Sequence, residues 1–146
     1  MPFPPAVDPE KVGQYPALSK SGAGHFFDEV LEYRVWCHPE DGAPDECDGE
    51  DYYYAFATYE QALAFSESTL GAEEPLVLVR QLEWIDEPQE GVYVHERGER
   101  ITEWCVEWLE QGSRKPGEIE AFIEGQKRRD REALFCGEVS PRQSDA

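Results

Sequence analysis

The sequence predicts a single α+β domain, in which a mixed or mostly antiparallel sheet of about five strands carries two helices. Five short stretches have the apolar patterns of strands, and two longer stretches have the one-sided apolar pattern of helices. The connections between them are short and rich in turn-forming residues, as in hairpins. The chain has 146 residues, which is the size of one ordinary domain.

Residues 1–24 are expected to form an extended arm, because they contain five prolines and end in Ser-Gly-Ala-Gly. Proline removes backbone donors and glycine adds chain entropy, so neither favours a helix or a strand. Residues 25–136 are then the α+β domain, and residues 137–146 are expected to be a disordered tail. Three apolar side chains of the arm are available to pack on the domain: Phe3, Tyr15 and Leu18.

The first strand is predicted over residues 30–38, where apolar side chains occur on both faces until Pro39 ends the pattern. A loop over residues 39–51 and a short aromatic strand over residues 52–57 follow. Thr58-x-x-Gln61 has the spacing of a capping box, which predicts a helix that runs to about residue 70.

A continuous apolar stretch over residues 76–85 predicts a central strand. Shorter strands are predicted over residues 92–96 and 101–109, and Pro116 predicts the first turn of a second helix. The large apolar side chains of these patterns are expected to form the core: Trp36, Phe56, Leu63, Phe65, Leu76, Leu78, Val106 and Trp108.

The chain is strongly acidic, with 13 Lys and Arg against 32 Asp and Glu and a formal net charge of −19. Nucleic-acid binding requires clustered basic side chains, so this charge excludes a nucleic-acid partner and disfavours an anionic membrane surface. It is compatible with a protein partner that has a basic surface. The sequence has no apolar stretch of membrane-spanning length and no secretory signal, so a cytoplasmic protein is expected.

Metal binding is not indicated. The four cysteines, Cys37, Cys47, Cys105 and Cys136, form no Cys-x-x-Cys pair and are expected to be free thiols. Seven acidic residues crowd into the loop over residues 40–51 and offer oxygen ligands, but their spacing differs from that of an EF-hand. A solvated, mobile loop is expected, and a divalent cation site is the alternative.

Glu103 and Glu107 alternate with tryptophans in the predicted strand 101–109, which places both carboxylates on one face. A candidate site follows on a concave face of the sheet, with catalytic candidates Glu103, Glu107, His38 and Tyr54 and ligand-binding candidates Arg34 and Trp104. Carboxylates on a strand are costly to bury unless a cation or donor meets them. The favoured interpretation is therefore that they pair internally with Arg34, Arg80 or Arg100.

The stretch from Phe27 to Leu109 resembles a group of small uncharacterised bacterial proteins that are sometimes labelled GCN5-family acetyltransferases. The resemblance lies in Glu-Tyr-Arg-Val-Trp-Cys-His-Pro from residue 32, Tyr-Ala-Phe-Ala-Thr-Tyr-Glu-Gln-Ala from residue 54 and Arg-Ile-Thr-Glu-Trp from residue 100. Gly-Ala-Glu-Glu-Pro-Leu from residue 71 also belongs to it. That enzyme family cradles acetyl-CoA on a Gln/Arg-x-x-Gly-x-Gly/Ala turn before a helix, and the sequence has no such run.

The order of elements is similar to the second half of ADP-ribosyltransferase-like folds. That resemblance implies a His or Arg on an early strand, a Tyr or Ser on a later strand and a Glu on a late strand. In those enzymes the Glu orients a ribose hydroxyl and the His holds it. The positions of matching type are Arg34 or His38, Tyr53 or Tyr54, and Glu103 or Glu107.

We therefore expect a small acidic, non-catalytic binding or interaction protein whose ligand the sequence does not reveal. The alternative is an ADP-ribosyltransferase-like or acetyltransferase-like enzyme that acts on a nucleotide cofactor.

Overall fold

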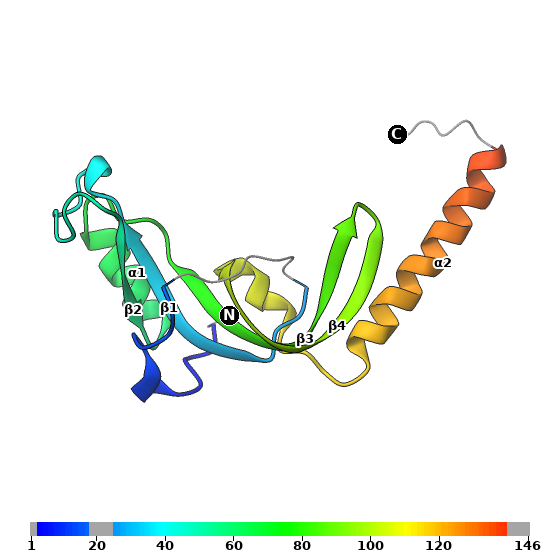
Figure 1. Ribbon diagram of the computed structural model, residues 1–146, viewed down its shortest axis with the longest axis horizontal. Coiled ribbons are helices and arrows are strands. Elements are labelled where there is room, and N and C mark those ends of the chain that lie inside the picture. Colours follow the sequence, from blue (N-terminus) through cyan, green and yellow to red (C-terminus); the bar gives the residue numbers. More distant parts are fainter. Residues whose placement is uncertain (1–2, 18–24, 140–146) are drawn as a thin grey trace.

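The computed structural model describes residues 3–17 and 25–139, with side chains described as far as Arg128. Four strands, two α-helices and three short 3-10 helices follow one another along the described residues (Figure 1). They are η1 (Pro9–Lys11), β1 (Glu29–Cys37), η2 (Pro39–Asp41), β2 (Tyr52–Phe56), α1 (Tyr59–Ser68), β3 (Leu76–Gln89), β4 (Val92–Cys105), η3 (Val106–Gln111) and α2 (Glu118–Val139).

The strands form one antiparallel sheet in the order β2-β1-β3-β4. The predicted α+β class is confirmed, but the expected number of about five strands is wrong, because the described residues form four. Two strands were predicted, over residues 92–96 and 101–109, but residues 92–105 form the single strand β4. The turn residues between the two predicted strands lie at a register shift opposite Gln81 and Glu83. In Figure 1 the β3–β4 hairpin curls away from the rest of the sheet.

The end of β4 also differs from the prediction. The strand stops at Cys105, and the chain continues as η3 rather than in strand conformation to residue 109. Side chains therefore stop alternating between the two faces of the sheet beyond Cys105. Trp108, which was predicted to be in the core, is 39% exposed. Trp104, which is only 1% exposed, fills that place in the core.

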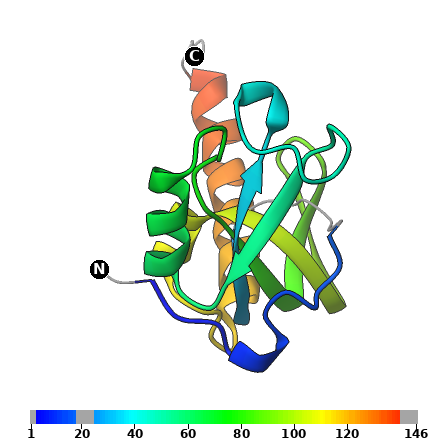
Figure 2. The ribbon, with the colours of Figure 1, turned by 90° about the vertical axis from the view of Figure 1, so that its left-hand side faces the viewer.

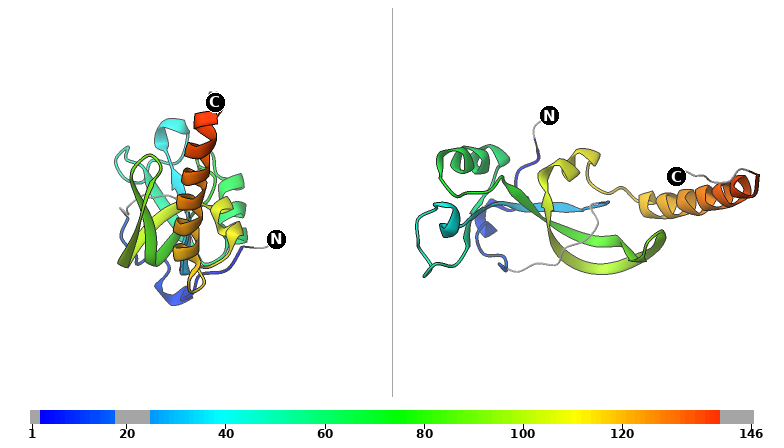
Figure 3. Two further views of the ribbon diagram at one scale, coloured as in Figure 1. Left: turned by 90° about the vertical axis from the view of Figure 1, so that its right-hand side faces the viewer. Right: turned by 90° about the horizontal axis from the view of Figure 1, so that it is seen from above.

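The core lies between the sheet and the layer formed by α1 and η3, which occupy one side of the sheet in the right-hand view of Figure 3. The predicted N-cap of α1 is confirmed, because Thr58 Oγ1 accepts a hydrogen bond from the Gln61 amide at 3.2 Å. The buried core cluster contains Phe27, Val30, Tyr33, Val35, Ala62, Val77, Val79, Trp104, Val106 and Leu109.

Of the side chains predicted for the core, Leu78 and Val106 are buried, as expected. Leu78 does not belong to the main core cluster, because it lies on the opposite face of the sheet from α1. Five others are only partly buried: Trp36, Phe56, Leu63, Phe65 and Leu76.

The described N-terminal residues wrap around the domain (Figure 2). Residues 3–7 lie on the α1 side, where the Phe3 ring packs against Tyr59 and the Ala6 amide bonds to the Ala57 carbonyl at 2.7 Å. Residues 13–17 lie on the other side, against polar side chains of the sheet. Leu18 and the rest of residues 18–24 lie outside the described residues, as do residues 140–146 of the expected tail.

Candidate functional site

The face of the sheet opposite α1 carries a cluster of polar side chains from three strands. A register shift between Val30 and Glu32 in β1 turns Val30 toward the core but places Glu32 and Arg34 on this opposite face. Glu32 pairs with Leu78, and Leu78 pairs with Glu103 of β4, so the two carboxylates share the face across β3.

Arg34 is the centre of this cluster. Its Nε lies 2.7 Å from Glu32 Oε2, and its Nη1 lies 3.4 Å from Glu103 Oε2. Trp36 Nε1 donates to the same Glu103 oxygen at 2.9 Å, and the Tyr53 ring stacks on the guanidinium at 4.4 Å from its centroid. The side chains of Arg34 and Glu32 are fully buried, while that of Glu103 is 21% exposed. We call these five residues the Arg34 cluster.

Residues 13–17, here called the strap, cover the cluster. The Gly13 amide donates to Glu32 Oε1 at 2.7 Å. Arg34 Nη2 donates to the Pro16 carbonyl at 2.5 Å, and Nη1 donates to the Ala17 carbonyl at 3.1 Å. Burial raises the pKa of the Tyr53 hydroxyl, which lies under the strap and close to Arg34. The charged groups are therefore paired with one another and shielded from solvent by the chain itself.

The structure brings two of the sequence-predicted site residues together, Arg34 and Glu103. Glu107 does not join them, because it belongs to η3 and is exposed. The expectation that Glu103 and Glu107 share a strand face is wrong, since β4 ends between them. Trp104 points to the opposite, core face of the sheet, where its ring packs against Phe27.

Tyr54 and His38 also lie away from the Arg34 cluster. Tyr54 packs against Phe65 of α1, and its hydroxyl donates to Glu46 at 2.5 Å. This hydrogen bond, followed by burial, raises the pKa of Tyr54 to about 12. His38 follows the end of β1 and faces the loop over residues 40–51, here called the acidic loop, rather than the Arg34 cluster.

His38 bridges two carboxylates. Its Nδ1 lies 2.9 Å from Asp51 Oδ1, and its Nε2 bonds to Glu73. The hydrogen bonds with Asp51 and then Glu73 raise the pKa of His38 above its usual value. The imidazole thus fastens the acidic loop to the segment that follows α1, while Ala43 packs against Gly71, where an added Cβ would lie 2.3 Å from the Ala43 nitrogen. The carboxylates of the acidic loop are mostly exposed, as expected, although its predicted mobility remains a prediction.

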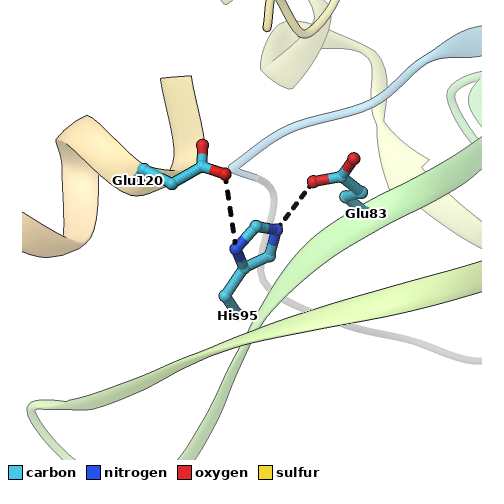
Figure 4. A group of neighbouring side chains, drawn as sticks. All are labelled: Glu83, His95 and Glu120. Atoms are coloured by element: carbon cyan, nitrogen blue, oxygen red, sulfur yellow. Dashed lines mark hydrogen bonds and ion pairs between the residues drawn. The ribbon is translucent and has the colours of Figure 1, made fainter. Parts of the chain in front are cut away.

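A second group with ligand-type side chains lies between the β3–β4 hairpin and α2. Glu83, His95 and Glu120 offer ligand atoms that lie within 4.8 Å of one another. Figure 4 shows the two carboxylates beside different ring nitrogens, with Glu83 at 2.7 Å from Nε2 and Glu120 at 3.8 Å from Nδ1. A metal ion binds one nitrogen of a histidine ring, whereas here the two carboxylates approach different ring nitrogens.

Two guanidiniums also reach this group. Arg114 Nη1 lies 3.6 Å from Glu83, and Arg97 Nη2 lies 3.7 Å from Glu120. The hydrogen bond from His95 and the charges of Arg114 and Arg97 hold the pKa of Glu83 below its usual value. The arrangement fits an ion-pair network that fastens α2 to the hairpin better than it fits a metal centre. The thiols of Cys37, Cys47 and Cys105 are free, and Cys136 lies beyond the described side chains.

An open cavity lies on the α1 side, between residues 3–7 and the segment that follows η3. It has a volume of about 790 Å³. Phe27, Val30 and Leu109 form its buried apolar floor. Its other lining residues are Phe3, Pro4, Pro5, Val7, Asp28, Glu29, Glu110, Gly112 and Ser113. We call this cavity the groove.

The polar side chains that line the groove are those of Asp28, Glu29, Glu110 and Ser113. Asp28 is held by Arg114, whose Nη2 lies 2.8 Å away, and Glu29 is held by Arg80. Glu110 is exposed, and the described lining residues include no lysine or arginine. The groove therefore combines an apolar floor with an acidic rim.

Comparison with known proteins supplies no relative. A scan against models of protein families, a search of curated proteins and a search of solved structures each found no match. The expected resemblances to acetyltransferase-labelled proteins and to ADP-ribosyltransferase-like folds therefore stay predictions. Within the described part of the chain, both α-helices fall short of the length or apolar character required to cross a membrane.

Sequence reasoning missed two partners that complete the Arg34 cluster, Glu32 and Trp36, and named Tyr53 only as an alternative to Tyr54. One signal was present, because Glu32 and Arg34 interrupt an apolar strand at alternate positions and so share a face if the strand is regular. The groove had no such signal, since its walls come from residues about one hundred positions apart in the chain.

Proposed function

We propose that this protein is a small, acidic, non-catalytic binding protein, and that the groove is its binding surface. The observation that carries the proposal is the combination of a cavity of about 790 Å³, an apolar floor and an acidic rim. Binding sites are commonly concave and mostly apolar, with a few polar groups that orient the ligand. Phe27, Val30 and Leu109 supply the apolar contact, and Glu110 supplies an exposed charge.

The occupant we propose is a segment of a basic protein partner that inserts an apolar side chain beside a lysine or arginine. The net charge of −19 attracts a basic partner over a long range and repels an acidic one. Asp28 and Glu29 are already paired with arginines, so Glu110 is the rim carboxylate that is available to a cation. An apolar side chain on the floor would provide most of the affinity, and the charge would provide the selectivity.

The test uses two synthetic pentapeptides that differ only in charge, Lys-Leu-Lys-Leu-Lys and Glu-Leu-Glu-Leu-Glu, with blocked ends. Binding is followed by amide chemical shifts of the ¹⁵N-labelled full chain. We expect the lysine peptide to shift the amides that line the groove and the glutamate peptide to have no effect. Equal binding of both peptides, or shifts confined to other surfaces, would refute the proposal.

A matched pair of variants locates the binding. Val7 lines the groove and is 53% exposed, so Val7→Ser removes apolar surface from the wall without changing the charge. Val92 is 45% exposed on the distant hairpin, and Val92→Ser is the control. Val7→Ser should weaken binding of the lysine peptide, while Val92→Ser should bind it as the parent does.

The alternative is an enzyme that acts on a nucleotide cofactor, and one contact favours it. Arg34 and Glu103, which have the residue types of the ADP-ribosyltransferase-like resemblance, lie 3.4 Å apart on one face of the sheet. Against it, Glu32 already neutralises Arg34, and the strap occupies the space in front of it. A thermal-shift measurement with NAD and with acetyl-CoA separates the two proposals, because only the enzyme requires either compound to stabilise the protein.

A further inference from the structure

The strap is bound to the Arg34 cluster entirely through its main chain. The Gly13 amide donates to Glu32, and Arg34 donates to the carbonyls of Pro16 and Ala17. Tyr53 adds a longer hydrogen bond to the Tyr15 carbonyl at 3.4 Å. The cluster thus presents an acceptor followed by several donors, which matches the amide and carbonyl groups of a peptide that turns at a glycine, as the strap does at Gly13.

The side chains of the strap contribute little to its attachment. Gly13, Gln14, Pro16 and Ala17 are exposed, and only Tyr15 is half-buried. The Gln14 amide turns back to the Glu10 carbonyl at 3.0 Å instead of contacting the sheet. Main-chain hydrogen bonds contribute modestly to stability, because each replaces one made with water. The strap is therefore held by groups that any polypeptide offers, with little apolar burial to retain its own sequence.

Charge further defines what the cluster accepts. Glu32 and Glu103 carry two negative charges against the one positive charge of Arg34, so the cluster has a net charge of −1. This excess negative charge would repel a phosphate or a free carboxylate, but it does not repel the neutral main chain of a peptide. Arg34 is also fixed by Glu32 and by stacking on Tyr53, which preorganises its donors toward carbonyl oxygens.

We propose that the Arg34 cluster is a binding site for a peptide main chain that turns at a glycine, and that the strap occupies it as an internal ligand that a partner peptide displaces. This site lies on the face of the sheet opposite the groove and does not depend on the function proposed for the groove. Because the strap belongs to the same chain, its effective concentration at the site is of millimolar order. A peptide supplied in solution therefore binds the parent protein weakly and binds tightly once the strap is released.

The experiment uses the full chain and a fluorescently labelled peptide with the sequence of residues 11–17. The strap is released by Gly13→Pro, because Gly13 has a φ of +87° and its amide bonds to Glu32. Proline has no amide hydrogen and cannot adopt a positive φ. Gly49→Pro is the matched control, since Gly49 has a φ of +82° and donates to Asp45 at 2.6 Å in the acidic loop. An added Cβ would meet no atom within 4 Å at either glycine.

Fluorescence anisotropy should show at least a tenfold gain in affinity for Gly13→Pro over the parent, as expected for removal of an intramolecular competitor. Gly49→Pro should bind the peptide like the parent. A second peptide carries N-methylglycine at the position equivalent to Gly13, which removes the amide hydrogen offered to Glu32. This N-methylated peptide should bind the Gly13→Pro variant at least tenfold more weakly than the unmodified peptide does.

A measurement without any substitution keeps the test independent of variant folding. Addition of the unlabelled peptide to the ¹⁵N-labelled parent should shift the Gly13 and Ala17 amide signals together, because both residues leave the cluster with the strap as the peptide enters. The proposal is overturned if Gly13→Pro folds but binds no tighter than the parent, or if the N-methylated peptide binds equally well. Saturation with peptide that leaves both NMR signals unmoved would overturn it too.

Discussion

Three glutamate-to-glutamine substitutions should differ sharply in their effect on stability, although each removes one carboxylate from the same small domain. Glu32→Gln has the largest effect, because Glu32 lies 2.7 Å from a guanidinium and both side chains are fully buried. Removing Glu32 leaves the buried guanidinium with only the longer contact to Glu103, and breaking a buried pair in this way costs up to about 3–5 kcal/mol. A loss of this size is a large part of the free energy of unfolding of a domain of this length.

Glu103→Gln should have an intermediate effect. Its carboxylate is 21% exposed and lies 3.4 Å from Arg34, which keeps Glu32 as its main partner. The amide oxygen of glutamine can still accept the hydrogen bond from Trp36. We therefore expect a loss of about 1.5–3 kcal/mol, the range for a hydrogen bond to a charged group.

Glu107→Gln is the control, because Glu107 is exposed in η3 and should not measurably change stability. Urea unfolding at neutral pH, followed by tryptophan fluorescence, measures all three variants against the parent. A double-mutant cycle with Arg34→Met should give a larger coupling energy for Glu32 than for Glu103. Equal losses for Glu32→Gln and Glu107→Gln would refute the argument, since they would mean that solvent reaches Arg34.

The other predictions concern the sheet, the first helix and the acidic loop. Leu78→Ala should cost about 2–5 kcal/mol in urea unfolding, because Leu78 is fully buried, and a loss under about 0.5 kcal/mol would contradict its burial. Thr58→Ala should cost about 1 kcal/mol through loss of the N-cap of α1, with Thr58→Ser close to the parent. The pKa of His38 is raised in the folded state, so its protonated form is stabilised by Asp51 and Glu73. This stabilisation should be complete below about pH 6.5, the pKa of an unperturbed histidine, and should disappear as the pH rises through the pKa of His38 in the folded protein. The stability difference between the parent and His38→Asn should accordingly shrink from pH 5.5 to pH 8.5, and a difference that grows would contradict the sign.

Local sequence patterns were sufficient where neighbouring residues decide the structure. The N-cap at Thr58 depends on the amide three residues later, so its sequence signature identified it correctly. The first strand and the helix after Thr58 were likewise predicted within about two residues of their observed bounds. The preference for internal pairing of a strand carboxylate also came from local chemistry, and Glu103 is indeed paired with Arg34.

The sequence pattern failed where the backbone departs from regular alternation. The apolar pattern continued through Trp108, but β4 turns into η3 after Cys105, which exposes Trp108 and leaves Trp104 in the core. Side chains point to alternate faces only while the chain remains a strand, and the apolar pattern does not indicate the residue at which the strand ends. For the same reason, the prediction that Glu103 and Glu107 lie on one strand face was wrong, because β4 ends between them.

By itself, then, the sequence determined that the chain is acidic, that its fold is of the α+β class, and where most of its elements lie. Only the tertiary structure decided what meets at the candidate sites. Arg34 and Glu103 are 69 positions apart, and the strap reaches Arg34 from 17 and 18 positions away, so their contacts depend on sheet order and on the path of the N-terminal segment. Those features follow from packing the whole chain, because strand pairing is selected by the burial of complete faces rather than by any short stretch of residues.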